Sequence, residues 1–397
     1  MMNIYQNIAR EELQLRWARV QSVMATQGVE ALIVSDNTSI CYMAGRIFGG
    51  VVYVAVDREP IFFVRRPVGL EGDNIVYIRK VEDIPNLLQE RGYPLPNNIA
   101  LEGDVVSHNE YTRLQRIFAL DPKSILPTAT AIMRYARSVK TAYEIEQVRL
   151  SGVKHAELYS LIPSLFRRGM SDNDIAIELE YQARRLGSVG NMRIFGRTME
   201  VFIGSILVGD NACAPSPYDF ALGGAGVDPS LPVGGNGTVI EDGMVLMVDQ
   251  GGNFGSYMTD MTRVYSLGTP PDLARRAHDA ALEIQSCMME MVVAGTPTAD
   301  VYNMSKEVAQ REGLSQYFMG QSQQAGFVGH GVGMEVNEVP VLAPRSREVF
   351  EVGNVFAIEP KFTLPGIGAV GVENTFVVTA DGVEKLTIFD ESIIPLE

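Results

Sequence analysis

The sequence predicts two domains, a smaller α/β domain over residues 1–137 and an α+β domain over residues 138–397. With 397 residues and 46% hydrophobic side chains, the chain can bury more than one core. The pattern also changes along the chain, because short apolar runs alternate with helical spacing up to Leu120, whereas long amphipathic helices begin near Ser138. The later apolar runs are separated by glycine-rich loops, which favours helices covering an antiparallel-rich sheet.

The elements of the first domain follow from local spacing. Apolar residues at helical spacing predict a helix through residues 13–24 that ends at Gly28. The run 29–34 predicts a strand, and the runs 51–56 and 61–64 flank a turn-forming segment, which predicts a hairpin.

The second domain is predicted to contain longer helices and several buried strands. One helix is expected to run from Ser138 to Gly169, and Ser171 supplies a cap for the next, which ends at Gly187. Two further helices are expected over residues 272–293 and 299–312. Strands are expected over residues 245–248, 261–265, 355–358 and 371–378.

Composition excludes several classes of partner. The net charge is −15 and basic residues occur at most in pairs, so nucleic acid and anionic membrane surfaces are poor partners. The first residues carry charges, and no apolar stretch approaches the roughly 20 residues that span a bilayer. The three cysteines, Cys41, Cys213 and Cys287, form no CxxC spacing, so we expect a protein of the reducing cytoplasm without a disulfide framework.

Acidic residues at strand ends are the most informative chemical feature. Asp249 ends one apolar run and Asp260 begins the next, and a hairpin would bring the two carboxylates together. Such a pair in apolar surroundings is costly unless a cation lies between the two groups. His330, Glu359 and Glu373 likewise interrupt or adjoin apolar runs. Four carboxylates and one imidazole suit two divalent ions that share bridging carboxylates.

The local sequences VDQGG, TDMTR, GHGVG, AIEP and VEN, which carry these five residues in order, resemble the signature of the pita-bread metalloenzymes. That family includes methionine aminopeptidase, aminopeptidase P, prolidase and the metal-free creatinase. The segment GVEALIVSDNTSICYMAGR is similar to the amino-terminal domain of the creatinase, prolidase and aminopeptidase P branch. The resemblance implies a pita-bread catalytic domain over residues 138–397, preceded by a creatinase-type α/β domain.

The resemblance also implies a role for each of the five residues. Asp249 would chelate one metal, Asp260 and Glu373 would bridge both metals, and His330 and Glu359 would complete the second. Glu359 would manage the proton of the attacking metal-bound hydroxide, so Glu359 and His330 are the expected catalytic residues. Manganese is the first choice for the two divalent ions, with cobalt, zinc or iron as alternatives.

The sequence departs from the prolyl peptidases of this branch at three positions. Where those enzymes carry two further histidines and an arginine, this chain has Ser216, Asn337 and Gly371. Ser216 and Asn337 can still donate hydrogen bonds to a substrate, so they are the expected substrate-binding residues.

These features predict a dinuclear-metal hydrolase that cleaves a peptide or amide bond of a small molecule or short peptide, as Xaa-Pro dipeptidases and aminopeptidase P do. The resemblance to that branch implies a homodimer. Two alternatives stay open. The same fold and metals could act on a non-peptide amino acid derivative, by hydrolysis or elimination, or the chain could be a catalytically silent, peptidase-like binding module.

Overall fold

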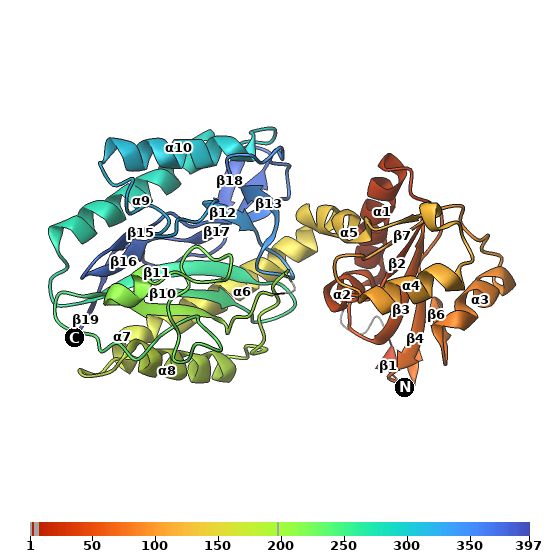
Figure 1. Cartoon of the computed structure of the whole chain (residues 1–397), viewed down its shortest axis with the longest axis horizontal. Coiled ribbons are helices and arrows are strands. Elements are labelled where there is room, and N and C mark those ends of the chain that lie inside the picture. Colours follow the sequence, from red (N-terminus) through yellow and green to blue (C-terminus); the bar gives the residue numbers. More distant parts are fainter. Residues whose placement is uncertain (1, 4–7, 197) are drawn as a thin grey trace. The chain divides into compact units, whose positions relative to one another are not determined.

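The computed structural model describes residues 2–3, 8–196 and 198–397, and the chain divides into two compact units, Met1–Arg137 and Ser138–Glu397. Figure 1 shows the elements of each unit along the chain. Among the described residues, no helix is both long and apolar enough to cross a membrane.

The first unit is built on a six-stranded sheet whose strands are flanked by helices. The strand order is β6 (Ile75–Tyr77), β4 (Ile61–Arg66), β3 (Gly49–Ala55), β2 (Ala31–Val34), β7 (Ile99–Leu101) and β8 (Ile125–Leu126). The helices are α1 (Arg10–Thr26), α2 (Asn37–Ala44), α3 (Ile84–Glu90), α4 (His108–Ile117) and α5 (Ala129–Ser138), and a small parallel pair is formed by β1 (Met2–Asn3) and β5 (Leu70–Glu71). The predicted hairpin is confirmed, because β3 and β4 pair antiparallel.

The second unit contains two larger sheets and a short hairpin. One sheet has the order β19 (Ile394–Leu396), β11 (Thr259–Leu267), β10 (Val245–Gly252) and β9 (Gly204–Val208). The other has the order β13 (Glu338–Leu342), β12 (Gly329–Gly331), β14 (Val355–Ile358), β17 (Asn374–Thr379) and β18 (Gly382–Lys385), and the hairpin consists of β15 (Lys361–Leu364) and β16 (Gly368–Gly371).

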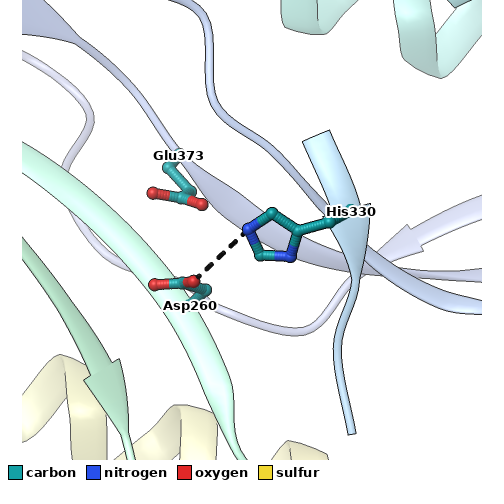
Figure 2. A group of neighbouring side chains, drawn as sticks. All are labelled: Asp260, His330 and Glu373. Carbon is teal, nitrogen blue, oxygen red and sulfur yellow. Dashed lines mark ion pairs between the residues drawn. The ribbon is translucent and has the colours of Figure 1, made fainter. Parts of the chain in front are cut away.

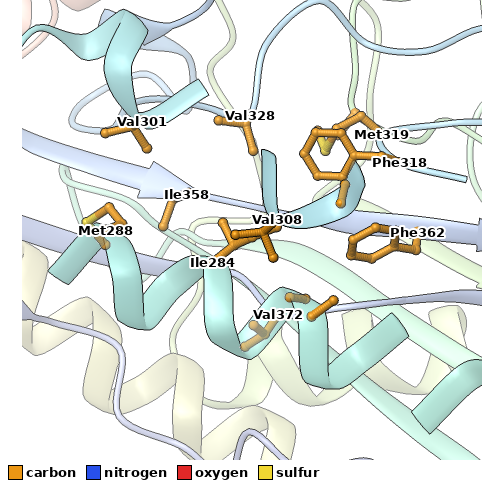
Figure 3. Packing of buried hydrophobic residues seen from close by; sticks show 14 of the residues in the cluster. Ile284, Met288, Val301, Val308, Phe318, Met319, Val328, Ile358, Phe362 and Val372 are labelled. Carbon is orange, nitrogen blue, oxygen red and sulfur yellow. The ribbon is translucent and has the colours of Figure 1, made fainter. Parts of the chain in front are cut away.

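Helices cover both sides of these sheets. In Figure 1, α9 (Asp272–Met291) and α10 (Thr298–Arg311) lie on one side, and α6 (Ala142–Ser160), α7 (Ile162–Leu165) and α8 (Asp172–Arg185) lie on the other. Ile284 and Met288 of α9 and Val308 of α10 belong to one buried cluster with Ile358 and Phe362 of the strands (Figure 3). The predicted mixed α and β architecture is confirmed.

Two expected elements are divided in the structure. The helix expected to run to Gly169 divides into α6 and α7, because Pro163 lacks the amide hydrogen that a continuous helix requires. The strand expected over residues 371–378 divides between β16 and β17, and Glu373 lies between them.

Candidate metal centre

The two aspartates lie on neighbouring strands of one sheet. β10 and β11 pair antiparallel, with Asp249 opposite Thr262 and Gly251 opposite Asp260. Because residues two apart along a strand point to the same face, Asp249 and Asp260 share a face and are one diagonal step apart. The hairpin predicted from the sequence therefore does bring the two carboxylates together.

The other three candidates come from the second sheet. His330 is the central residue of β12 and lies opposite Ala357 of β14, Glu359 directly follows β14, and Glu373 directly precedes β17. An isolated bridge joins Thr262 to Glu373 and thus connects the two sheets at this point. The Thr262 hydroxyl donates to Oε2 of Glu373 over 2.7 Å, which fixes that carboxylate beside β11.

The five side chains form two sets of potential metal ligands that share Glu373. One set is Asp260, His330 and Glu373, shown in Figure 2, and the other is Asp249, Glu359 and Glu373. Within each set, one ligand atom from each residue lies within 4.8 Å of the others. Glu359 therefore groups with Asp249, although its Oε1 is also 3.4 Å from Nε2 of His330.

Lys361 also lies within the second set, although it is not among the site residues predicted from the sequence. Its Nζ donates to Oδ2 of Asp249 over 2.7 Å, to Oε2 of Glu359 over 2.6 Å and to Oε2 of Glu373 over 3.2 Å. The side chain is 0% exposed. Lys361 follows Glu359 by two residues at the start of β15, and this i, i+2 relationship was the signal available in the sequence.

The ammonium group of Lys361 sets the charge of the second set. Burial opposes its protonation, but the carboxylates of Asp249, Glu359 and Glu373 outweigh burial and raise its pKa well above the ordinary value. Burial would by itself raise the pKa of Glu359, whereas the Lys361 charge and the hydrogen bond from His330 lower it to about 2. Lys361 and Glu359 are therefore both charged at neutral pH.

The first set, by contrast, is short of positive charge. Burial and then the Glu373 carboxylate raise the pKa of Asp260 well above its usual range. Burial raises the pKa of Glu373 to about 8, against the lowering effect of Lys361. For His330, burial favours the neutral ring, but the Glu359 hydrogen bond and charge raise its pKa overall. A cation bound among these groups would remove the repulsion and stabilise both carboxylates in the ionised form.

Two details fit a cation at the first set. Nδ1 of His330 is 3.2 Å from the carbonyl oxygen of Gly331, which can only accept a hydrogen bond, so Nδ1 carries the proton. A cation that replaced the Nε2 proton would leave a neutral ring whose Nε2 lone pair, 3.8 Å from Oδ2 of Asp260, is available as a ligand. Oε1 of Glu373 is buried and has no hydrogen-bond partner among the described residues. A buried carboxylate oxygen without a partner is costly unless a ligand satisfies it.

The two expected substrate-binding residues have other partners. Oδ1 of Asn337 accepts from the backbone N–H of Phe195 over 2.7 Å, and Nδ2 donates to the Phe195 carbonyl over 2.9 Å. Ser216 is buried, accepts weakly from the Tyr218 N–H over 3.3 Å, and lines a cavity whose lining residues include none of the five ligand candidates. Both side chains therefore bond, in the described part of the chain, to groups other than the five ligand candidates.

Gly371 lies opposite Lys361 in the β15–β16 hairpin. A Cβ atom at this position would lie 2.4 Å from the carbonyl oxygen of Pro360 and 3.1 Å from Cγ of Lys361. The absence of a side chain at Gly371 therefore leaves the space through which the Lys361 stem passes.

Strand-borne carboxylates and a histidine that converge at the junction of two sheets are typical of metal-dependent hydrolases. Residues 146–380 match the model of metallopeptidase family M24, and residues 16–139 match the creatinase/prolidase N-terminal domain. The chain belongs to metallopeptidase family M24. It also matches the creatinase-type amino-terminal domain, and it is a metal-dependent hydrolase.

Similar proteins cover nearly the whole chain. An Xaa-Pro dipeptidase of Pyrococcus furiosus is 20% identical over 386 residues, which are 96% of this chain and 99% of that protein. An uncharacterized peptidase of Bacillus subtilis is 21% identical over 96% of this chain and 100% of that protein. Among solved structures, an Xaa-Pro dipeptidase from Bacillus anthracis matches with a TM-score of 0.78 and 24% identity, over 97% of this chain and 100% of that one. The prolidase from Pyrococcus horikoshii matches with a TM-score of 0.75 and 18% identity, over 96% and 99%. These structures share the fold.

Proposed function

We propose that the chain hydrolyses a peptide or amide bond of a short peptide or small amide at the cluster of Asp249, Asp260, His330, Glu359 and Glu373. The observation that carries this proposal is the buried set of Asp260, His330 and Glu373, in which one Glu373 oxygen has no protein partner. Three protein ligands leave further coordination positions open, which is characteristic of a catalytic rather than a structural metal site.

A divalent ion held there would polarise the substrate carbonyl and lower the pKa of a water molecule. Asp260 and Glu373 would supply oxygen ligands, and His330 would supply Nε2, because its Nδ1 is directed to Gly331. Manganese remains the first choice for this oxygen-rich set, with cobalt, zinc and iron as alternatives.

Glu359 is the proposed proton acceptor. Its carboxylate is buried, lies 3.4 Å from Nε2 of His330, and is kept ionised by Lys361. An ionised carboxylate beside the ligand set can accept a proton from the attacking water and deliver it to the leaving amine. Lys361 fixes the other oxygen of the same carboxylate, which orients Oε1 toward His330.

The names of the relatives make Xaa-Pro dipeptides the first substrates to test, and one observation favours the alternative of a non-peptide amino acid derivative. Asn337 is already hydrogen bonded to Phe195 through both ends of its amide, and Gly371 has no side chain. Neither position therefore offers a charged group to hold a substrate carboxylate.

The test is hydrolysis of matched Xaa-Pro and Xaa-non-Pro dipeptides by protein supplied with Mn²⁺, Co²⁺ or Zn²⁺, with Asp260→Ala as the blank. Cleavage of Xaa-Pro dipeptides by the wild type alone supports a prolyl dipeptidase. Metal binding without dipeptide cleavage contradicts that assignment and directs the search to cyclic or N-substituted amino acid derivatives. Absence of bound metal would instead support the silent binding module.

We also propose that the chain forms a homodimer, as the resemblance implies. Light scattering of the purified protein checks this, since a mass near that of one 43.5 kDa chain would contradict it. A cytoplasmic location stays a prediction.

A further inference from the structure

We propose that the metal centre of this chain is mononuclear, with the ammonium group of Lys361 in the position that a second metal ion would need. The inference rests on the proposed function only in assuming that the ligand candidates bind metal, and it replaces the expectation of two ions.

The ammonium group of Lys361 binds every residue of the second ligand set. Lys361 Nζ is hydrogen bonded to Asp249, Glu359 and Glu373 over 2.6 to 3.2 Å, and these three residues make up the whole of the second ligand set. An ammonium group has three hydrogens, so these three bonds use its full donor capacity. One oxygen of each carboxylate in the second set is therefore already bound to a cation.

The charge of the carboxylate cluster also disfavours a second metal ion. Asp249, Asp260, Glu359 and Glu373 contribute at most four negative charges. One divalent ion and one ammonium group supply three positive charges, whereas two divalent ions and the ammonium group would supply five. A second ion would share these three carboxylates with the ammonium group at close range, in a largely buried site that screens charge poorly, so the second ion is strongly disfavoured.

The two ligand sets differ in whether a cation is already bound to them. Oε2 of Glu373 is bound by Lys361 and by the Thr262 hydroxyl, whereas Oε1 is buried with no partner among the described residues. Among the described residues, the ion pairs of Lys361 are with Asp249, Glu359 and Glu373 and involve neither Asp260 nor His330. One set is thus complete without metal, and the other is complete only with a cation.

The Lys361 side chain cannot easily leave the second ligand set. Its side chain is 0% exposed, and its strand pairs with β16, where Gly371 lies directly opposite. Because a Cβ at Gly371 would be 3.1 Å from the Lys361 Cγ, the stem is closely packed in this direction. Removing the charged group from the cluster would also leave three carboxylates, two of them buried, without a counter-charge, which is strongly unfavourable.

The experiment is titration of the metal-free full-length protein with Co²⁺, followed by its visible absorbance and by calorimetry, with metal content measured after gel filtration. The wild type is expected to reach its endpoint at one equivalent per chain. Lys361→Ala, which opens the second set, is expected to reach its endpoint at two equivalents. Lys306→Ala, an exposed lysine on α10, is the matched control and should match the wild type.

An endpoint of two equivalents for the wild type would overturn the proposal, and so would an endpoint of one for a folded Lys361→Ala protein. If Lys361→Ala does not fold, Asp249→Asn decides the question: a mononuclear centre keeps one equivalent, whereas loss of an ion relative to the wild type overturns the proposal. These counts need no substrate. A one-equivalent endpoint without dipeptide cleavage therefore contradicts the proposed peptidase activity and leaves the mononuclear centre standing.

Discussion

Oε2 of Glu359 accepts a hydrogen bond of 2.6 Å from Nζ of Lys361, two residues further along the chain, while Oε1 lies 3.4 Å from Nε2 of His330. One carboxylate is thus held between a fixed cation and a candidate metal ligand. Its orientation is determined at both oxygens, which is what a proton acceptor in a catalytic site requires.

Glu359→Gln should abolish most of the activity while the protein remains folded. The amide keeps the shape of the carboxylate but cannot accept a proton from water, so we expect kcat to fall by about 10²- to 10⁴-fold. Steady-state kinetics on the best substrate, with circular dichroism as a check of folding, measure this. Glu384→Gln is the control, because Glu384 is a half-exposed partner of Arg149. Equal losses in both variants would contradict the role of Glu359.

Asp260→Asn should weaken metal binding. The substitution removes one charged ligand from the set of Asp260, His330 and Glu373, so affinity should fall by at least the roughly 10- to 100-fold that loss of a group supporting a ligand costs. Competition with a chelator of known affinity measures this. Asp242→Asn, an exposed aspartate paired with Arg168, should bind metal as the wild type does. An unchanged affinity of the Asp260 variant would remove Asp260 from the ligand set.

Stability should decrease with acidity because of His155 on α6. Its side chain is fully buried, Nδ1 is 3.1 Å from the Thr259 hydroxyl, and Nε2 has no hydrogen-bond partner among the described residues. Burial, assisted by the charge of Arg263, lowers its pKa to about 3. The unfolded chain takes up this proton near pH 6.5 and the folded chain only near pH 3, so the free energy of unfolding falls by about 1.4 kcal/mol per pH unit between these values.

His155→Phe keeps a ring against Tyr159 but cannot titrate. Urea unfolding at several values from pH 7 down to pH 4.5 should therefore give a slope of stability against pH that is smaller by about one proton than in the wild type. Parallel curves for the two proteins would show that His155 does not contribute to the acid sensitivity.

Asn337→Ala should loosen the loop that contains Phe195. The side-chain amide of Asn337 makes two hydrogen bonds to the backbone of that residue, and their loss leaves backbone groups unpaired, which costs about 1–3 kcal/mol. Limited proteolysis should cut the variant between residues 187 and 203 faster than the wild type. A raised KM with unchanged proteolysis would instead support direct contact of Asn337 with substrate.

Gly371→Ala should destabilise the protein and disturb the Lys361 side chain. The added methyl group would lie 2.4 Å from the Pro360 carbonyl oxygen, an overpacking that costs about 1–3 kcal/mol. Gly255→Ala is the matched control, since a Cβ there has no atom within 4 Å. Thermal unfolding of both variants checks this, and equal midpoints would contradict the close packing at Gly371.

The parts of the site that depend on local order were predictable. Asp249 and Asp260 belong to one hairpin, and alternation along its strands is enough to place both carboxylates on one face. The division at Pro163 is also local and could have been predicted from the chain itself.

The remaining parts depend on contacts between distant segments. Asn337 was expected to bind substrate, but the structure joins its amide to a residue 142 positions away. A buried lysine is rare unless it is paired, and the three partners of Lys361 are brought together only when two sheets and a hairpin have packed. The i, i+2 spacing from Glu359 places Lys361 near one carboxylate, but periodicity gives no information about its long-range contacts with Asp249 and Glu373.

The bridge between Thr262 and Glu373 has a consequence for the order of events during translation. Asp249 and Asp260 are synthesised before Glu373, so their hairpin can form while the carboxylate that joins both ligand sets has yet to be made. Both ligand sets therefore become complete only late in synthesis, and metal loading follows the assembly of the sheets. Lys361 is already in place when the sheets pack and neutralises part of the acidic cluster, which allows the newly made enzyme to fold first and acquire its metal afterwards.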